Sequence, residues 1–351
     1  MASASRPPAR RIWRRPRLLA VGVVLAQGFI ACAIALAQDA PPTYTNPVYP
    51  KDFPDPFVLV DGGKYYAYGT QTQGTGFQLM ESNDLVHWTS RVLEFPIPWA
   101  EEHYWAPEVV RRNNQYYLTY SALDPASRKH HVAVATADRP TGPFTHRGLL
   151  VRGDSNKVGV IDATHFFEPD GSAFLVYSEE TPRRVVMRSA APDLLSVGPD
   201  VTELIRPDLD WERGVTEAPT IVRRNGIYHL FYSAGPYEGT KQSGRYSVGH
   251  AQAGALKGPY VKSPRPILES VEGATYGPGH QCLVQTPDGS WWMLYHAWDN
   301  VGQPRYGQNP SGRTVRLDRV EWAGDEPRVL GPTLTPQPAP SAAIAPVRAG
   351  R

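Results

Sequence analysis

The chain of 351 residues carries 36 basic and 34 acidic side chains, and six arginines but no acids lie in residues 1–37. Residues 38–351 carry 30 basic and 34 acidic side chains, which gives a net charge of −4. This composition does not indicate nucleic-acid binding, which would need a basic patch. Cys282 is the one cysteine after residue 37, which excludes an internal disulfide there and leaves stability to a large core.

The first 37 residues have the order of an export signal. Arginines precede an apolar run from Leu18 to Ala37, and Ala35-Leu36-Ala37 supplies the small residues that a signal peptidase needs. A retained membrane anchor is the alternative, because about 20 apolar residues can span a bilayer. The small residues favour cleavage, so we expect a secreted or periplasmic protein with no membrane attachment after processing.

One unit recurs five times after the signal: a short strand, a polar turn and an aromatic strand. In the first unit, Asp55-Pro56-Phe57-Val58-Leu59 leads through Asp61-Gly62-Gly63 to Lys64-Tyr65-Tyr66-Ala67-Tyr68. Such turns between apolar runs are strong hairpin signals. The starts of successive units are 53, 54, 55 and 63 residues apart.

This period predicts the fold. Each unit continues with a second strand pair, such as Phe77-Gln78-Leu79-Met80 in the first unit. Five units of four antiparallel strands, with almost no helical periodicity, predict an all-β, five-bladed β-propeller over residues 38–332. Two β-sandwich domains are the alternative, but they do not explain a regular period. The Pro- and Ala-rich segment 333–351 is predicted to be a disordered tail.

A polar residue opens each unit and is a candidate for the functional site. The innermost strand of a propeller blade lines the central channel, so we expect these five residues to lie near one another: Asp55, Glu108, Asp162, Glu217 and His280. Converging carboxylates raise one another's pKa, and such groups in a cleft are functional-site candidates.

Two carboxyl groups of this kind suffice for glycoside hydrolysis. One is protonated and donates to the leaving oxygen, and the other is ionised and activates water. A separation of roughly 6.5–9.5 Å leaves room for that water and inverts the anomeric centre, and carboxylates from different blades allow such a distance. Trp105, three residues before Glu108, offers a flat apolar surface for a sugar ring.

The ordered motifs resemble glycoside hydrolase family 43 over roughly residues 44–330. Each motif is weak by itself, whereas their order through all blades is specific. The matching segments are Phe53-Pro54-Asp55-Pro56, Ser82-Asn83-Asp84-Leu85-Val86-His87-Trp88, Trp105-Ala106-Pro107-Glu108, Ile161-Asp162-Ala163, Thr216-Glu217-Ala218-Pro219, Gly277-Pro278-Gly279-His280, Gly312-Arg313 and Val320-Glu321-Trp322.

The resemblance implies three catalytic residues. Asp55 would be the general base and Glu217 the general acid. Asp162 would orient the acid and keep its pKa high. The resemblance gives no chemical role to Glu108, which we expect behind the pocket, although the neighbouring Trp105 favours a place near it.

The resemblance also implies substrate-binding residues. Trp105 and Arg313 would bind the sugar in the cleavage subsite, and Arg313 is open to a second interpretation as a salt bridge to a pocket acid. His280 matches a channel histidine, which in arabinanase-like members lies beside a calcium or similar ion. Ca²⁺ prefers several oxygen ligands, so a structural metal at His280 is left open. No cofactor is required for the chemistry.

The implied reaction is hydrolysis, with inversion, of arabinose- or xylose-containing plant polysaccharides or oligosaccharides. The short segment after Trp322, where xylosidases of the family often carry another β-sandwich, favours α-L-arabinofuranosidase or arabinanase activity. Two alternatives are a non-catalytic glycan-binding propeller, which would tolerate loss of a channel acid, and an invertase-type glycosidase, whose Asn-Asp-Pro-Asn start is absent. We expect a monomer.

Overall fold

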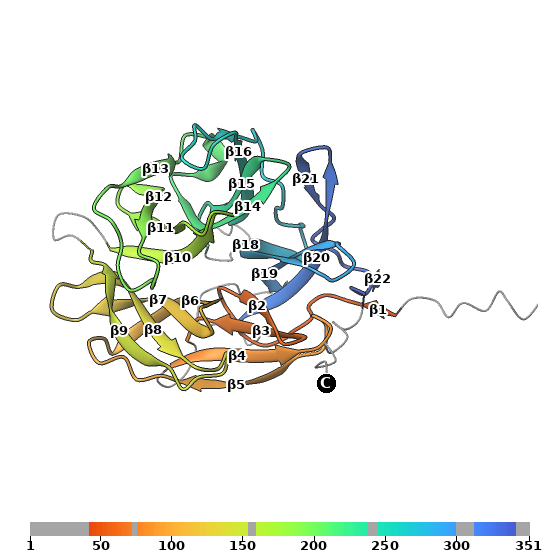
Figure 1. Cartoon of the computed structure of the whole chain (residues 1–351). Coiled ribbons are helices and arrows are strands. Elements are labelled where there is room, and N and C mark those ends of the chain that lie inside the picture. Colours follow the sequence, from red (N-terminus) through yellow and green to blue (C-terminus); the bar gives the residue numbers. More distant parts are fainter. Residues whose placement is uncertain (1–41, 72–75, 154–158, 238–244, 300–311, 342–351) are drawn as a thin grey trace, which may run out of the picture. The chain divides into compact units, whose positions relative to one another are not determined.

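The computed structural model describes residues 42–71, 76–153, 159–237, 245–299 and 312–341, so the predicted export signal lies outside the described residues. The unit that starts at Thr43 contains five four-stranded antiparallel sheets, and the predicted all-β, five-bladed propeller is confirmed (Figure 1). None of the described residues forms a helix long and apolar enough to cross a membrane.

Every blade is built from four strands that are consecutive in the sequence. A short 3-10 helix at Asp210–Glu212 precedes the fourth blade. The strands of the five blades are, in chain order, β2 (Phe57–Asp61), β3 (Lys64–Gly69), β4 (Gly76–Ser82) and β5 (Thr89–Glu94); β6 (Glu102–Arg112), β7 (Gln115–Asp124), β8 (Lys129–Ala137) and β9 (Thr145–Val151); β10 (Val160–Phe167), β11 (Ala173–Glu180), β12 (Arg183–Ala190) and β13 (Thr202–Ile205); β14 (Thr216–Arg224), β15 (Ile227–Ala234), β16 (Ser247–Ala253) and β17 (Val261–Lys262); β18 (Thr275–Gln285), β19 (Trp291–Asp299), β20 (Arg313–Ala323) and β21 (Glu326–Val329).

The first strand of each blade lies at the centre of the ring. Each of β2, β6, β10, β14 and β18 contacts the first strands of both neighbouring blades, and Figure 1 shows them gathered around the middle. Four of the polar residues that open the units, Glu108, Asp162, Glu217 and His280, are therefore carried by the innermost strands, and Asp55 lies two residues before β2.

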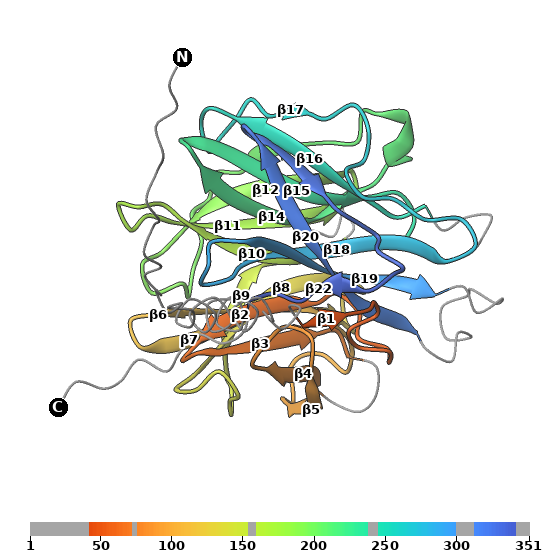
Figure 2. The same cartoon turned by 90° about the vertical axis from the view of Figure 1, so that its right-hand side faces the viewer.

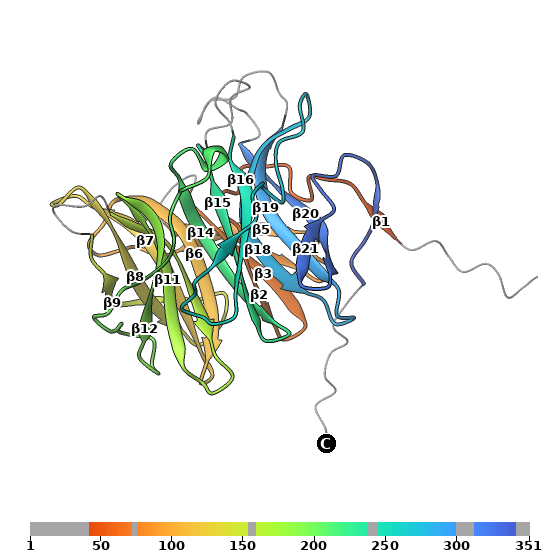
Figure 3. The same cartoon turned by 90° about the horizontal axis from the view of Figure 1, so that it is seen from above.

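Apolar clusters fill the interfaces between neighbouring blades, which pack face to face (Figure 3). The second strand of each blade contributes a fully buried tyrosine at an equivalent position, and these are Tyr68, Tyr120, Tyr177, Tyr232 and Tyr295. Each hydroxyl has a hydrogen-bond partner, as a buried tyrosine requires. The aromatic repeat seen in the sequence is thus the core between the blades.

The ring closes where the N-terminal segment packs on the fifth blade (Figure 2). Tyr49 forms a bridge to Val315 in β20, and the Tyr44 hydroxyl donates to the carbonyl of Leu317 at 2.6 Å. Strand β1 (Thr43–Tyr44) also pairs with β22 (Gln337–Pro338). Residues near the start and near the end of the described chain, far apart in the sequence, therefore meet on one blade.

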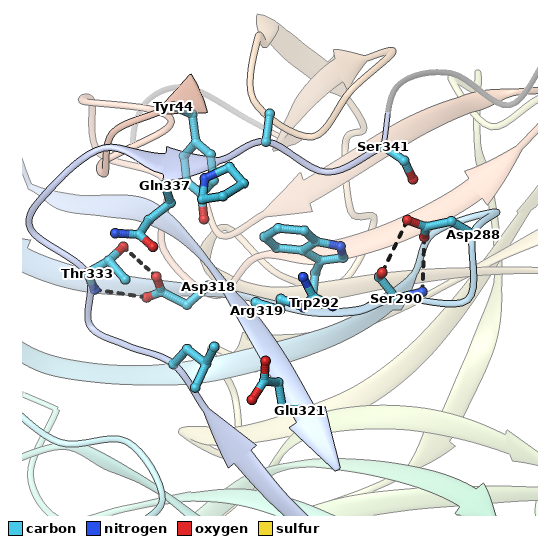
Figure 4. A pocket seen from close by; sticks show the side chains of 13 residues that line it. Tyr44, Asp288, Ser290, Trp292, Asp318, Arg319, Glu321, Thr333, Gln337 and Ser341 are labelled. Atoms are coloured by element: carbon cyan, nitrogen blue, oxygen red, sulfur yellow. Dashed lines mark hydrogen bonds between the residues drawn. The ribbon is translucent and has the colours of Figure 1, made fainter. Parts of the chain in front are cut away.

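Residues 333–341 differ from the predicted disordered tail. Thr333 donates to the buried carboxylate of Asp318 through its hydroxyl at 2.5 Å and its backbone N–H at 3.3 Å, and Gln337 pairs in β22 (Figure 4). A cavity of about 180 Å³ lies beside this segment, and Tyr44 and Trp292 are among its lining residues. Proline is tolerated at a sheet edge, so a Pro-rich composition did not prevent this short pair. Residues 342–351 lie outside the described residues.

Candidate active site

All five blades contribute to one cavity of about 360 Å³. The three residues predicted to be catalytic, Asp55, Asp162 and Glu217, line it. The three predicted to bind substrate line it as well, and the complete lining is Asp55, His103, Trp105, Ile161, Asp162, Glu180, Arg183, Glu217, Tyr237, Tyr246, His280 and Arg313.

A local irregularity at or just before each innermost strand aims these side chains. Besides other positive-φ residues such as His103, each blade has one non-glycine residue there with a positive φ: 56° at Asp55, 45° at Ala106, 55° at Asp162, 51° at Ala218 and 48° at His280. In β6, β10, β14 and β18 it coincides with a β-bulge in the pairing with the second strand. Such backbone costs of order 1–3 kcal/mol, and it is enriched at functional sites.

Asp55 is held in its ionised form. Arg313 Nη1 lies 3.0 Å from Oδ1, and the Thr70 hydroxyl donates to Oδ2. Burial by itself would raise the pKa of Asp55, but the Arg313 guanidinium, the neighbouring His280 and His296, and the Thr70 hydrogen bond hold it below its usual range. Burial lowers the pKa of both histidines, so near neutral pH they are uncharged and Arg313 and Thr70 are the effective partners.

The surroundings of His280 do not match a calcium site. Its Nδ1 lies 3.3 Å from Asp55 Oδ1, where the guanidinium of Arg313 already supplies the positive charge. No group of three or more His, Cys, Asp or Glu side chains gathers as a ligand set within the described ranges. The donors present therefore give no support to a metal at this position, and Ca²⁺ would need more oxygen ligands.

Two donors hold Glu217. Arg183 Nη1 lies 2.8 Å from Oε2, and the Tyr246 hydroxyl donates to Oε1 at 2.9 Å. Burial raises the pKa of Glu217, Arg183 and Tyr246 lower it, and the charges of Asp55 and Glu180 raise it again. The net effect is a raised pKa, which is the direction that a proton donor needs.

Asp162 is coupled to Glu217 through the backbone. Its Oδ2 accepts the N–H of Ala218 at 3.2 Å, so it fixes the peptide that follows Glu217. Burial and then the Glu217 carboxylate raise the pKa of Asp162 well above its usual range. The two carboxyl groups hold a proton as a pair. Since Arg183 contacts Glu217, this arrangement favours the proton on Asp162.

An aromatic wall from the second blade forms another side of the cavity. The Trp105 ring stacks on His103 with centroids 4.5 Å apart, and His130 packs on Trp105 at 4.4 Å. His103 Nδ1 lies 3.0 Å from His130 Nε2, and His130 Nδ1 lies 2.8 Å from Glu180 Oε2. The wall thus ends in a carboxylate from the third blade.

Glu108 does not line the cavity, and the bulges explain why. It lies two residues after the bulge residue Ala106, whereas Glu217 directly precedes the bulge residue Ala218. Trp105, not Glu108, is therefore the counterpart of Glu217 in its blade. Burial raises the pKa of Glu108 to about 8, partly offset by a hydrogen bond with Thr164.

Sequence reasoning missed several residues of the lining: His103, Glu180, Arg183, Tyr237 and Tyr246. Glu180 and Arg183 flank the turn between β11 and β12, where the sequence reads as an ordinary polar turn. Tyr246 directly precedes β16. The shared Ala-Pro pair of Trp105-Ala106-Pro107 and Glu217-Ala218-Pro219 aligns Trp105 with Glu217, but it points to none of these five residues.

Comparisons with known proteins place the chain in a family of glycosyl hydrolases. The sequence model of glycosyl hydrolases family 43 matches residues 44–327. A β-D-galactofuranosidase of Aspergillus niger is 30% identical over 72% of this chain and 75% of its own length. An extracellular endo-α-(1→5)-L-arabinanase of Bacillus subtilis is 26% identical over 83% of this chain and 92% of its own. The crystal structure of a thermostable family-43 glycoside hydrolase superposes with a TM-score of 0.74 at 32% identity, covering 86% of this chain and 100% of that one.

Proposed function

The chain belongs to glycoside hydrolase family 43, and on this basis we propose that it hydrolyses α-L-arabinofuranosidic bonds with inversion, using Glu217 as general acid and Asp55 as general base. The observation that carries the proposal is the contrast between the two carboxyl groups. Burial keeps the pKa of Glu217 high, whereas the groups around Asp55, Arg313 foremost, outweigh burial and keep its pKa low. Carboxyl groups whose pKa values are pushed apart divide into acid and base.

The proposed reaction consumes one water molecule. Glu217 transfers its proton to the glycosidic oxygen while the bond from that oxygen to the anomeric carbon breaks. Asp55 takes a proton from water, whose oxygen forms the new bond on the opposite face of the sugar. Asp162 fixes the peptide beside Glu217, Arg313 keeps Asp55 ionised and hydrogen-bonds the sugar, and the Trp105 ring packs on the sugar.

The substrate proposal is a furanoside. The Aspergillus and Bacillus relatives are named for β-D-galactofuranoside and α-L-arabinan hydrolysis. These two sugars share the configuration of the furanose ring carbons, and galactofuranose is longer by one hydroxymethyl group. A pocket for one ring therefore suits the other, which favours furanosides over β-D-xylosides.

The sugar preference is tested by hydrolysis of three aryl glycosides: an α-L-arabinofuranoside, a β-D-galactofuranoside and a β-D-xyloside. Debranched arabinan, arabinoxylan and xylo-oligosaccharides provide the natural counterparts. We expect arabinose release to dominate, and ¹H NMR of fresh product should show the inverted anomer first. Dominant xylose release would contradict the substrate proposal, and a retained anomer would contradict the mechanism.

We further propose that the protein is exported, cleaved near Ala37 and monomeric. The arginine-rich and apolar order of residues 1–37 supports export, and the Bacillus relative is named as extracellular. N-terminal sequencing of protein from the periplasm or medium should begin after Ala37. A cytoplasmic chain that still begins at Met1 would contradict this proposal, and light scattering measures the oligomeric state.

A further inference from the structure

Arg183 pairs with the residue that must donate a proton. Its Nη1 lies 2.8 Å from Glu217 Oε2, and its side chain is 38% exposed whereas that of Glu217 is 10% exposed. Arg183 begins β12 in the third blade, so the contact crosses to β14 in the fourth. A cation beside a carboxyl group favours the ionised form. The contact therefore opposes the protonation that a general acid requires.

The oxygen that Arg183 contacts is the one that must meet the substrate. The other oxygen, Oε1, accepts the hydroxyl of Tyr246, a buried residue whose ring stacks on His296 with centroids 5.8 Å apart. Tyr246 also packs on Gly279, where an added Cβ would lie 2.2 Å from the ring. Tyr246 is thus fixed in place, and a glycosidic oxygen has to approach Oε2, where Arg183 now lies.

Arg183 has a second acidic neighbour on its own hairpin. Glu180 is its direct cross-strand partner in the β11–β12 pairing and also lines the cavity. The Cβ atoms of such partners are about 5 Å apart, within reach of an arginine side chain. His130 Nδ1 lies 2.8 Å from Glu180 Oε2, and within the described ranges no hydrogen bond or ion pair engages Glu180 Oε1. A change of rotamer therefore suffices to move Arg183 from Glu217 to Glu180.

We propose that Arg183 is a positioning residue that the substrate moves: it opposes protonation of Glu217 in the free enzyme, and the leaving sugar displaces it toward Glu180. The inference rests on the proposed role of Glu217 as general acid. The other charged groups that face Glu217 are carboxyl groups, Asp162 on β10, Glu180 on β11 and Asp55 before β2, and Tyr246 is neutral. Once the guanidinium leaves, these carboxyl groups favour a proton on Glu217, which it then donates.

The test is the alkaline limb of the pH profile on an arabino-oligosaccharide, whose poor leaving group needs the acid. The alkaline limb of kcat/KM reports the pKa of the general acid in the free enzyme. The alkaline limb of kcat reports its pKa in the enzyme–substrate complex. An adjacent opposite charge shifts a carboxyl pKa by 1–3 units, and the partial exposure of Arg183 places the effect at about one unit. We expect the wild-type kcat limb about one pH unit above the kcat/KM limb. In R183M the kcat/KM limb should rise by about one unit and meet the kcat limb.

Two variants serve as controls. R183K keeps the charge and should retain part of the separation between the limbs. Arg184, the next residue, pairs instead with Glu179 at 2.7 Å and Glu203 at 2.9 Å, so R184M removes an equal charge and should leave both limbs in place. Thermal melting checks that all variants fold.

A second readout needs no turnover. In the free protein labelled with ¹³C at glutamate carboxyl carbons, the Glu217 signal, assigned by its loss in E217Q, should titrate about one unit higher in R183M. Unchanged titration together with unchanged limbs would overturn the role of Arg183, even if E217Q confirms Glu217 as the acid. A failure of the proposed function is distinct, because the wild type itself would then release no sugar or E217Q would retain full activity.

Discussion

Removal of the Arg313 charge should move the acidic limb of activity to higher pH. A general base acts only when ionised, so activity persists as pH falls until the pKa of Asp55 is reached. Arg313 holds that pKa below its usual range, and both side chains are at least 88% buried. In R313M, burial of Asp55 dominates, and its pKa rises.

The size of the effect follows from the 3.0 Å contact between Arg313 Nη1 and Asp55 Oδ1. Charges about 4 Å apart at an effective dielectric constant of about 20 interact by ~4 kcal/mol, which corresponds to about three pKa units. Thr70 keeps its hydrogen bond, and water can enter the space that Arg313 leaves. We therefore expect the acidic limb to rise by about one to two pH units, into the range of ordinary carboxyl groups.

The assay is kcat/KM against pH on an activated aryl arabinofuranoside, which depends little on the general acid. R313K keeps the positive charge and should keep the limb low, although its activity falls because the guanidinium contacts are lost. R111M is a matched charge removal, since Arg111 pairs with Asp61 at 2.9 Å outside the cavity and is 48% exposed. A limb in R313M that coincides with that of the wild type would refute the electrostatic role of Arg313.

Three further predictions concern other parts of the chain. E217Q should lose most activity on natural oligosaccharides but far less on an aryl glycoside. D55N should lose about 10²-fold or more in activity on both substrates. The reverse pattern would exchange the roles of general acid and general base. D162N should move the alkaline limb to lower pH, because the second carboxyl group, whose ionised form opposes loss of the last proton of the pair, is gone; a pH–rate profile measures this. Deletion of residues 333–351 should lower the free energy of unfolding, measured by urea titration, by about 1–3 kcal/mol, because Asp318 loses the Thr333 hydrogen bonds. An unchanged urea midpoint would show that the segment does not stabilise the fold.

The sequence alone predicted the architecture because the propeller repeats a local pattern. Alternating apolar residues and turn signals specify a hairpin within a few residues, and five copies specify the ring. The repeat also predicted that Asp55, Asp162 and Glu217 face a common channel, and the structure places all three in one cavity. The repeat by itself also directed Glu108 toward the channel, but Glu108 is not among the residues that line the cavity, because a bulge shifts which residue of each strand faces it.

The pairing of side chains around these carboxyl groups was decided by tertiary structure. Arg183 meets Glu217 across two blades, and His130 meets Glu180 in the same way. Neither contact repeats along the chain, since each depends on how far an individual hairpin turn reaches over the channel. The sequence therefore determined which acids gather at the centre of the propeller. Only the packing of neighbouring blades decided which of them meets a cation, and that contact sets which carboxyl group carries the proton.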